Sequence, residues 1–110
     1  MWMVNPKLLC RQHLLGEHNE LHKVVGHIRK GNEEVVKGHA RKGQIDTSKI
    51  RERHEELVAE MERRGYNHNS ELDYEDNLNL GEIDRKRNLQ DLKKRCDSCR
   101  EKIDKTDKLF

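Results

Sequence analysis

Residues 10–30 read CRQHLLGEHNELHKVVGHIRK, and this stretch has the periodicity of an amphipathic helix. One face carries apolar residues at helical spacing, namely Leu14, Leu21, Val25 and Ile28. A second set repeats at the same spacing, about 100° further round the helix, and comprises Cys10, His13, Glu17, Glu20 and His27. Carboxylates and imidazoles beside a buried face are groups whose protonation a protein can control. The stretch therefore predicts both a core helix and a candidate site.

The rest of the chain predicts further amphipathic helices and no convincing strand. Asn5 and Pro6 have the pattern of an N-cap followed by proline, and Gly31 and Gly65 are typical helix ends. The expected elements are a helix from about Pro6 to Lys30, a loop over 31–46 with room for one helical turn, a helix over 48–64, an irregular connection over 66–81 and a helix from about Ile83 to Lys105. Together they predict an all-α fold, a small three-helix bundle in one domain over residues 1–110.

The composition restricts how such a bundle is held together and what it binds. With 40% charged and 32% hydrophobic residues, a core forms only if the apolar residues fall on facing sides of the helices. A net charge of +2 is too small to indicate nucleic-acid binding by itself. The charges are separated, however, because residues 66–84 are acidic and rich in asparagine whereas residues 85–95 are basic. The chain can therefore carry a basic face at near-neutral total charge.

Targeting signals and cysteine usage indicate a compartment. The sequence has no apolar run long enough to span a bilayer and no start typical of a signal peptide, so no membrane partner is expected. Three cysteines are an odd number and too few for a disulfide framework. We expect the reducing cytoplasm.

The cysteines allow two interpretations. Leu89, Leu92, Cys96, Cys99 and Ile103 are spaced three, four, three and four residues apart, which is the pattern of a packing surface. Alternatively, Cys96 and Cys99 have the spacing of half a zinc site, and Cys10 and His13 repeat that spacing on the first helix, so the four could form a Cys₃His site. Packing as small apolar residues is the interpretation we adopt, and it predicts no metal and no cofactor.

Short motifs on the first two predicted helices resemble a known family. Gln12-His13-Leu14, then Glu17, then Glu20-Leu21 resemble the pyrimidine-dimer DNA glycosylase family. The resemblance returns in ELVAE at 56–60 and RRGYN at 63–67, on the second predicted helix and its end. Two motifs in the same order, each on the expected helix, are less easily matched by chance than one.

This resemblance implies a fold and a reaction. The fold is a compact three-helix protein with an extended N-terminal segment packed against the bundle. The activity is that of a DNA repair glycosylase with abasic-site lyase activity on ultraviolet pyrimidine dimers in double-stranded DNA, in a bacterial cell or a phage-infected host. We expect the chain to be a monomer. The N-terminal amine, here that of Met1, attacks the sugar C1′ and forms a Schiff base, Glu20 matches the essential glutamate, and His13 matches a histidine that assists.

The residue types agree with that implied chemistry. An α-amine loses its proton nearer to neutral pH than a lysine does, so it is a nucleophile that needs no desolvation. A neighbouring carboxylate can accept protons and stabilise an iminium ion. Glu17 is expected to fix a neighbouring basic or imidazole group, and Trp2 and Tyr66 are the rings available to stack on a base.

The remaining polar residues carry less specific expectations. Binding of the DNA backbone is assigned to Arg11, Lys23, Arg29, Lys30, Lys93, Lys94 and Arg100. The other histidines are expected at the surface, namely His18, His22, His27, His39, His54 and His68. An alternative function is a non-catalytic helical module that binds DNA or protein and is stabilised by zinc.

Overall fold

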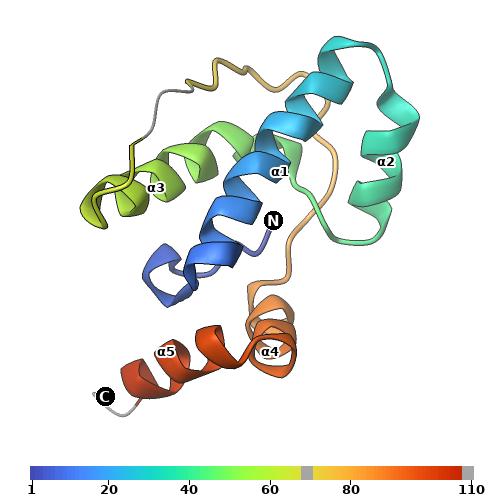
Figure 1. Ribbon diagram of the computed structural model, residues 1–110. Helices are drawn as coiled ribbons and strands as arrows, with labels where there is room; N and C mark the ends of the chain where they lie inside the picture. The colour runs from blue at the N-terminus through green and yellow to red at the C-terminus, as the bar shows by residue number, and fades with distance from the viewer. Residues whose placement is uncertain (68–70, 108–110) are drawn as a thin grey trace.

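The computed structural model describes residues 1–67 and 71–107, and every regular element within them is helical. The all-α prediction is confirmed. The elements are the 3₁₀ turn η1 (Pro6–Leu8), α1 (Arg11–Arg29), α2 (Glu33–Arg41), the 3₁₀ turn η2 (Thr47–Lys49), α3 (Ile50–Arg63), α4 (Arg85–Arg95) and α5 (Asp97–Asp107) (Figure 1).

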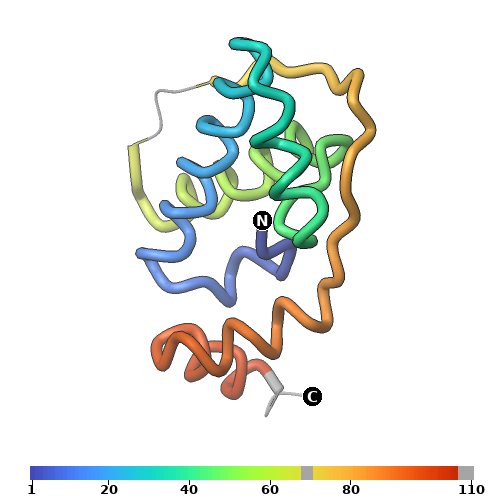
Figure 2. Tube along the Cα trace, turned by 90° about the vertical axis from the view of Figure 1, so that its right-hand side faces the viewer, coloured from blue at the N-terminus to red at the C-terminus, as the bar shows by residue number. Residues whose placement is uncertain are grey.

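The N-terminal segment lies between two groups of helices. Helix α1 packs on α2 and α3, while α4 and α5 pack on each other and α5 also contacts η1. Figure 2 shows residues 1–9 running between the α1–α3 group and the α4–α5 pair. The expected extended N-terminal segment packed against the bundle is therefore confirmed, and it is the segment on which the two groups meet.

The loop predicted over 31–46 is wrong, because most of this stretch forms α2. Only Val36 of this helix is buried, so the apolar signal in the sequence is weak. The helix instead places Glu33 and Glu34 in its first turn and Arg41 in its last turn, as the helix dipole favours. Lys37 pairs with both glutamates along the exposed side.

The predicted first and third helices are also interrupted. The chain is extended at Leu9 and Cys10, so α1 begins at Arg11 and Pro6 starts only a 3₁₀ turn. The single helix predicted from Ile83 to Lys105 is broken at Cys96, which has extended dihedral angles of φ −135° and ψ 112°. The break turns α5 back so that Cys99 and Ile103 reach the core.

The second predicted helix and the connection after it are confirmed. Helix α3 with η2 covers 47–63, and Gly65 follows it as predicted. Residues 66–67 and 71–81 contain no helix or strand, while residues 68–70, with His68, lie outside the described residues.

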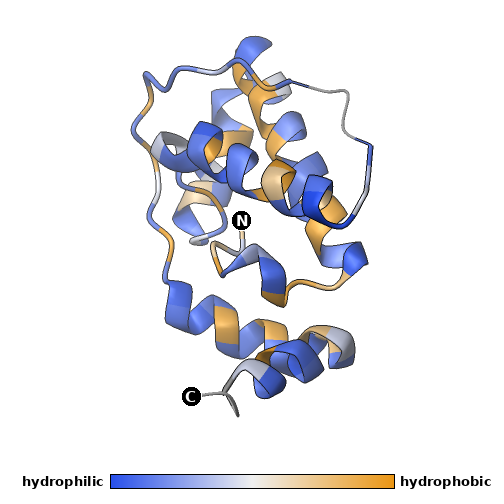
Figure 3. Cartoon of the chain, turned by 90° about the vertical axis from the view of Figure 1, so that its left-hand side faces the viewer, coloured by the Kyte–Doolittle hydropathy of each residue, from blue (hydrophilic) through white to orange (hydrophobic). Residues whose placement is uncertain are grey.

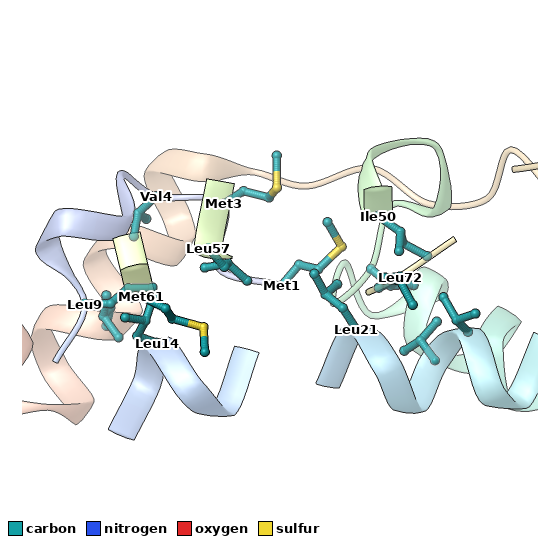
Figure 4. Close-up of a cluster of buried hydrophobic side chains, with 14 of the residues drawn as sticks. Met1, Met3, Val4, Leu9, Leu14, Leu21, Ile50, Leu57, Met61 and Leu72 are labelled. Carbon is teal, nitrogen blue, oxygen red and sulfur yellow. The ribbon is translucent and has the colours of Figure 1, made fainter. Parts of the chain in front are cut away.

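The core is built largely from the N-terminal segment, α1 and α3. Figure 4 shows this cluster, in which the buried side chains include Met1, Met3, Val4, Leu9, Leu14, Leu21, Ile50, Leu57, Met61 and Leu72. Hydrophilic residues cover much of the helix surfaces, with apolar residues interspersed among them (Figure 3). Because the first nine residues contribute to this core, their path is fixed by packing.

The connection from α3 to α4 crosses closely over the loop after α2. The Thr47 amide donates to the Leu80 carbonyl at 2.9 Å, and the Leu80 amide donates to Thr47 Oγ1 at 2.8 Å. Gly81 has a φ of +86°, and a Cβ atom there would lie 2.0 Å from the carbonyl oxygen of Ile45. Only glycine fits at this crossing, which fixes the position of the loop that contains Gln44 and Ile45.

Candidate functional site at the N-terminal amine

The Met1 α-amine is held between α1 and the loop after α2. It donates a hydrogen bond to Glu20 Oε1 at 3.0 Å and another to the Gln44 carbonyl oxygen at 2.8 Å. The side chain of Met1 is fully buried, whereas 44% of the Glu20 side chain is exposed. The amine therefore stands at the boundary between the core and solvent, with a carboxylate in contact.

The backbone of the N-terminal segment explains how the amine reaches Glu20. Met3 has a φ of +57°, which is uncommon for a residue with a side chain, and its side chain is buried. Asn88 of α4 donates from Nδ2 to the carbonyl oxygens of Met1 and Trp2, at 3.1 and 3.0 Å. Packing of Met3 and two hydrogen bonds from α4 thus orient the amine toward α1.

The amine opens into a cleft of about 540 Å³ between α1, the end of α2 and α4. Its charged lining is mixed, with four acidic residues, Glu20, Glu82, Asp84 and Asp91, and four basic residues, Lys23, Lys42, Arg87 and Arg95. Trp2, His27 and His39 also line it. A cleft of this volume is within the range of small-molecule sites and has room for one nucleotide.

The structure brings together two of the three predicted catalytic residues. Met1 and Glu20 are in contact in the cleft, whereas His13 is not among the residues that line it. The His13 ring meets the edge of the Trp2 ring with centroids 5.9 Å apart, and its Nδ1 lies 3.1 Å from Cys10 Sγ. His13 therefore faces the cysteines, and we do not retain it as part of the chemistry at Met1.

The predicted DNA-binding residues do not form one surface around the amine. Of these, only Lys23 lines the cleft. Three of the others have polar partners elsewhere: Arg29 donates to the Asp73 carbonyl, Lys93 pairs with Asp104 and Arg100 pairs with Asp97. Arg11 lies over the ring of Tyr66. Lys30 and Lys94 are exposed.

The cleft also contains basic residues outside the predicted DNA-binding set. Lys42, Arg87 and Arg95 line it beside Lys23. The basic run at 85–95 was visible in the sequence, but the side of α4 that faces Met1 could be identified only from the packing.

Glu17 has a structural role, and the expectation that it fixes a basic group is confirmed. Arg53 of α3 donates from Nε and Nη2 to the two Glu17 oxygens, at 2.5 and 3.0 Å, and both side chains are almost fully buried. Arg53 also donates to the Val4 carbonyl at 2.7 Å. This pair therefore joins α1, α3 and the N-terminal segment that carries the amine.

The prediction that the remaining histidines lie at the surface is wrong for His18 and His54. His18 and His54 are buried, and with the half-buried His22 they form a cluster between α1 and α3. The Nε2 atoms of His22 and His54 lie 3.2 Å apart. His18 and His22 are four residues apart and therefore lie on one side of α1, where both rings contact His54 of α3.

Cys99 is buried in the hydrophobic core, as the packing interpretation expected, while Cys10 and Cys96 are half-buried beside it. Within the part of the chain that the structure describes, none of the helices combines the length and the apolar character that a membrane span requires.

Fold and site together define a small α-helical protein that presents its own N-terminal amine, against a carboxylate, in an open cleft. The family model of pyrimidine dimer DNA glycosylases matches residues 1–74, so the chain belongs to this family. It is thus a member of a family of DNA repair glycosylases, whose substrate is damaged DNA. The matched region contains Met1, Glu20 and Gln44, whereas α4 and α5 lie beyond it. No curated protein and no solved structure shows significant similarity to the chain.

Proposed function

We propose that this protein is a glycosylase and abasic-site lyase for ultraviolet pyrimidine dimers in double-stranded DNA, with the Met1 amine as nucleophile. The observation that carries the proposal is the 3.0 Å contact between the Met1 nitrogen and Glu20 Oε1, two residues 19 positions apart, at the edge of an open cleft. An amine that only capped the chain would not need a half-exposed carboxylate and a substrate-sized space beside it.

The first step is removal of the damaged base. Glu20 accepts a proton from the α-amine, and the nitrogen lone pair then forms a bond to the sugar C1′. The bond between C1′ and the base nitrogen breaks, and its electron pair leaves with the base, which takes up a proton. Glu20 is close enough to accept the proton without moving.

The second step cuts the strand. The bond between C1′ and the ring oxygen O4′ opens as nitrogen and C1′ form an iminium ion, and O4′ receives a proton that Glu20 can return. Water then takes a proton from C2′, the C2′–H electron pair forms a C2′–C3′ double bond, and the bond between C3′ and its phosphate oxygen breaks as the phosphate leaves with that bond's electron pair. Water finally hydrolyses the imine and restores the amine. Once Glu20 has returned its proton, its negative charge stabilises the iminium ion.

The surrounding cleft supplies the contacts that this chemistry needs. Lys23, Lys42 and Arg87 can pair with the phosphates on either side of a nucleotide turned out of the duplex. Unstacking costs a few kcal/mol and is cheapest at a damaged site, which favours lesions over normal DNA. Trp2, at the edge of the cleft, presents a ring on which a base can stack.

The test is borohydride trapping on a duplex with an abasic site, because only an amine enzyme leaves a reduced covalent adduct. We expect the native chain to form the adduct at Met1, located by peptide mass spectrometry. Acetylation of the N-terminus, or a Gly-Ser extension before Met1, should abolish it. The matched control carries the same extension at the C-terminus and should be trapped like the native chain. Equal trapping of the chain extended before Met1 would overturn the proposal.

A non-catalytic DNA- or protein-binding module stabilised by zinc is the second candidate, and the clustered cysteines and His13 favour it. The two candidates differ in one experiment with a duplex that contains a cyclobutane pyrimidine dimer. The enzyme releases base and cuts the strand, whereas the module would bind the duplex and leave it intact.

A further inference from the structure

All three cysteines of the chain converge with His13 at one point. One potential ligand atom from each of these residues lies within 4.8 Å of all the others. The Sγ atoms of Cys10 and Cys96 are 3.8 Å apart, and His13 Nδ1 lies 3.1 Å from Cys10 Sγ and 3.7 Å from Cys99 Sγ. Cys10 and Cys96 are 86 positions apart in sequence, so the fold alone brings these atoms together.

These separations agree with a tetrahedral metal site. Zinc bonds of roughly 2.3 Å to sulfur and 2.0 Å to nitrogen place tetrahedral ligand atoms about 3.8 Å apart for two sulfurs and about 3.5 Å apart for sulfur and nitrogen. The Cys10–Cys96 distance of 3.8 Å equals the first value, and the Cys99–His13 distance of 3.7 Å is close to the second. The Cys10–His13 distance of 3.1 Å is shorter than the second value, so these two side chains must move slightly apart to bind the ion. Three thiolates and one imidazole are also a donor set that selects zinc over magnesium or calcium.

The local backbone presents the four ligands in two matching halves. Cys10 precedes α1 and His13 lies in its first turn, while Cys96 precedes α5 and Cys99 lies in its first turn. The Cys10 amide donates to Cys99 Sγ at 3.1 Å, and the Cys99 amide donates to Cys96 Sγ at 3.4 Å. Amide donors of this kind stabilise thiolates and orient metal ligands.

Simple core packing does not account for this arrangement. Cys99 lies in the hydrophobic core with Cys10 and Cys96 packed against it, but apolar packing alone does not require the thiols to face one another and a ring nitrogen as well. The break in the helix at Cys96 also serves to bring the cysteines together, since a continuous helix from Ile83 to Lys105 would not turn Cys99 toward the start of α1.

We propose that Cys10, His13, Cys96 and Cys99 bind one Zn²⁺ ion, which fastens the α4–α5 pair to the start of α1. The ion is structural, because four protein ligands leave no open position for a substrate. The site replaces the packing role predicted for the cysteines and the catalytic role predicted for His13. Two of its ligands lie in the segment beyond the family match, so the metal joins that segment to the matched region.

The site has a consequence for the cleft. Asn88, which holds the carbonyls of Met1 and Trp2, belongs to α4, as do Arg87 and Arg95 at the cleft wall. Loss of the metal should therefore loosen the α4–α5 pair and, with it, the position of the amine. The zinc site itself stands on its own ligands and does not depend on the proposed reaction.

The first test measures metal content in protein made with its native N-terminus and without a polyhistidine tag. We expect native mass spectrometry and elemental analysis to give one zinc per chain. After exchange with Co²⁺, the protein should show thiolate-to-cobalt charge-transfer absorption and the d–d bands of tetrahedral cobalt. Because this measurement uses the wild-type chain, it stands even if a variant fails to fold.

The second test uses variants that separate the two clusters able to hold a metal. Cys96→Ser and His13→Ala should reduce bound zinc at least tenfold, whereas His13→Cys should retain it, since a fourth thiolate also suits zinc. His22→Ala is the matched control, because it alters the other cluster, formed by His18, His22 and His54, and should keep one zinc. Chelation should accelerate hydrogen exchange in α4 and α5 while α1 and α3 stay protected.

Several results would overturn the inference. The site is excluded if the protein shows no cobalt–thiolate band and its native mass contains no zinc. That mass would equal the mass of the metal-free chain, or would be lower by two hydrogens if Cys10 and Cys96 form a disulfide. Retention of zinc in Cys96→Ser with its loss in His22→Ala would assign the metal to the histidines instead. Neither result bears on trapping at Met1, so the two proposals fail independently.

Discussion

Glu17 and Glu20 lie three residues apart on α1, yet one carboxylate is buried against Arg53 and the other is half-exposed against the Met1 amine. A single helical turn thus separates a structural glutamate from a candidate catalytic one. The burial of each carboxylate and the nature of its partner distinguish the two roles, and these properties lead to opposite expectations for the same substitution.

Glu20→Gln should remove turnover and leave the fold and DNA binding intact. Glutamine keeps an oxygen that accepts from the Met1 amine but cannot take its proton, so the loss falls on the chemical step, by about 100-fold or more. Single-turnover cleavage of abasic-site DNA measures the rate, and circular dichroism reports folding. Glu34→Gln is the control, because that side chain is 82% exposed on α2, and this variant should cut DNA at the wild-type rate. A Glu20→Gln protein that cuts at the wild-type rate would remove Glu20 from the mechanism.

Glu17→Gln should act on stability. Removing Glu17 leaves the buried Arg53 with only the half-exposed Glu56 as its ionic partner, which costs up to about 3 kcal/mol in the free energy of unfolding. Urea unfolding at neutral pH measures this change. The double variant Glu17→Met with Arg53→Met should recover part of the loss, because no buried charge then remains unpaired. A single variant as stable as the wild type would contradict the burial of this pair.

Stability should fall in acid through Glu60. Hydrogen bonds from Arg63 and Arg64 lower the pKa of Glu60 from its usual 4.5 to about 2 in the folded chain, although burial acts in the opposite direction. A carboxylate with a lowered pKa stabilises the fold above its unfolded pKa, and this contribution is lost as the pH falls from about 4.5 toward 2.

The Glu60 contribution is roughly 2 kcal/mol once the exposure of Arg63 is taken into account. Urea unfolding of the wild type and of Glu60→Gln at pH 6, 4 and 2.5 isolates this residue from other carboxylates. The difference between the two proteins should be largest at pH 6 and small at pH 2.5. A difference that is constant with pH would contradict the ion pairs.

Salt dependence should identify the surface that contacts DNA. Removing one basic side chain that pairs with a phosphate lowers the slope of log affinity against log salt by about 1. Lys23→Ala and Arg87→Ala, at the cleft, should each show this change. Lys94→Ala, an exposed residue of α4 that does not line the cleft, is the control and should keep the wild-type slope. An equal change in the control would mean that DNA binds across the outer face of α4.

The fold was predictable where apolar spacing was strong. The periodicity of α1 and α3 fixed both helices and their ends at Gly31 and Gly65. Helix α2 was missed because it buries only Val36 and depends on charge placement and on its contact with α1. The break at Cys96 was missed because neither proline nor glycine marks it, and the apolar spacing continues in register through it.

The candidate site was predictable only in part. Met1 and Glu20 followed from the family resemblance, and the structure brings them together. His13 shares a helix face with Glu20 and was predicted to assist catalysis, but the extended residues Leu9 and Cys10 place it among the cysteines instead. Arg87 and Asn88 could not be selected, because their role depends on how α4 packs across the N-terminal segment.

Substitution of Gly81 should disturb the candidate site, although this residue has no side chain that could take part in the chemistry. Any side chain there collides with the Ile45 carbonyl, whose neighbour Gln44 holds the Met1 amine. A side chain at this crossing would push the loop away from the amine, so a methyl group added at position 81 should displace Met1, the proposed nucleophile. A genetic screen for lost repair should therefore return position 81 beside positions 1 and 20, although glycine itself contributes no reactive group.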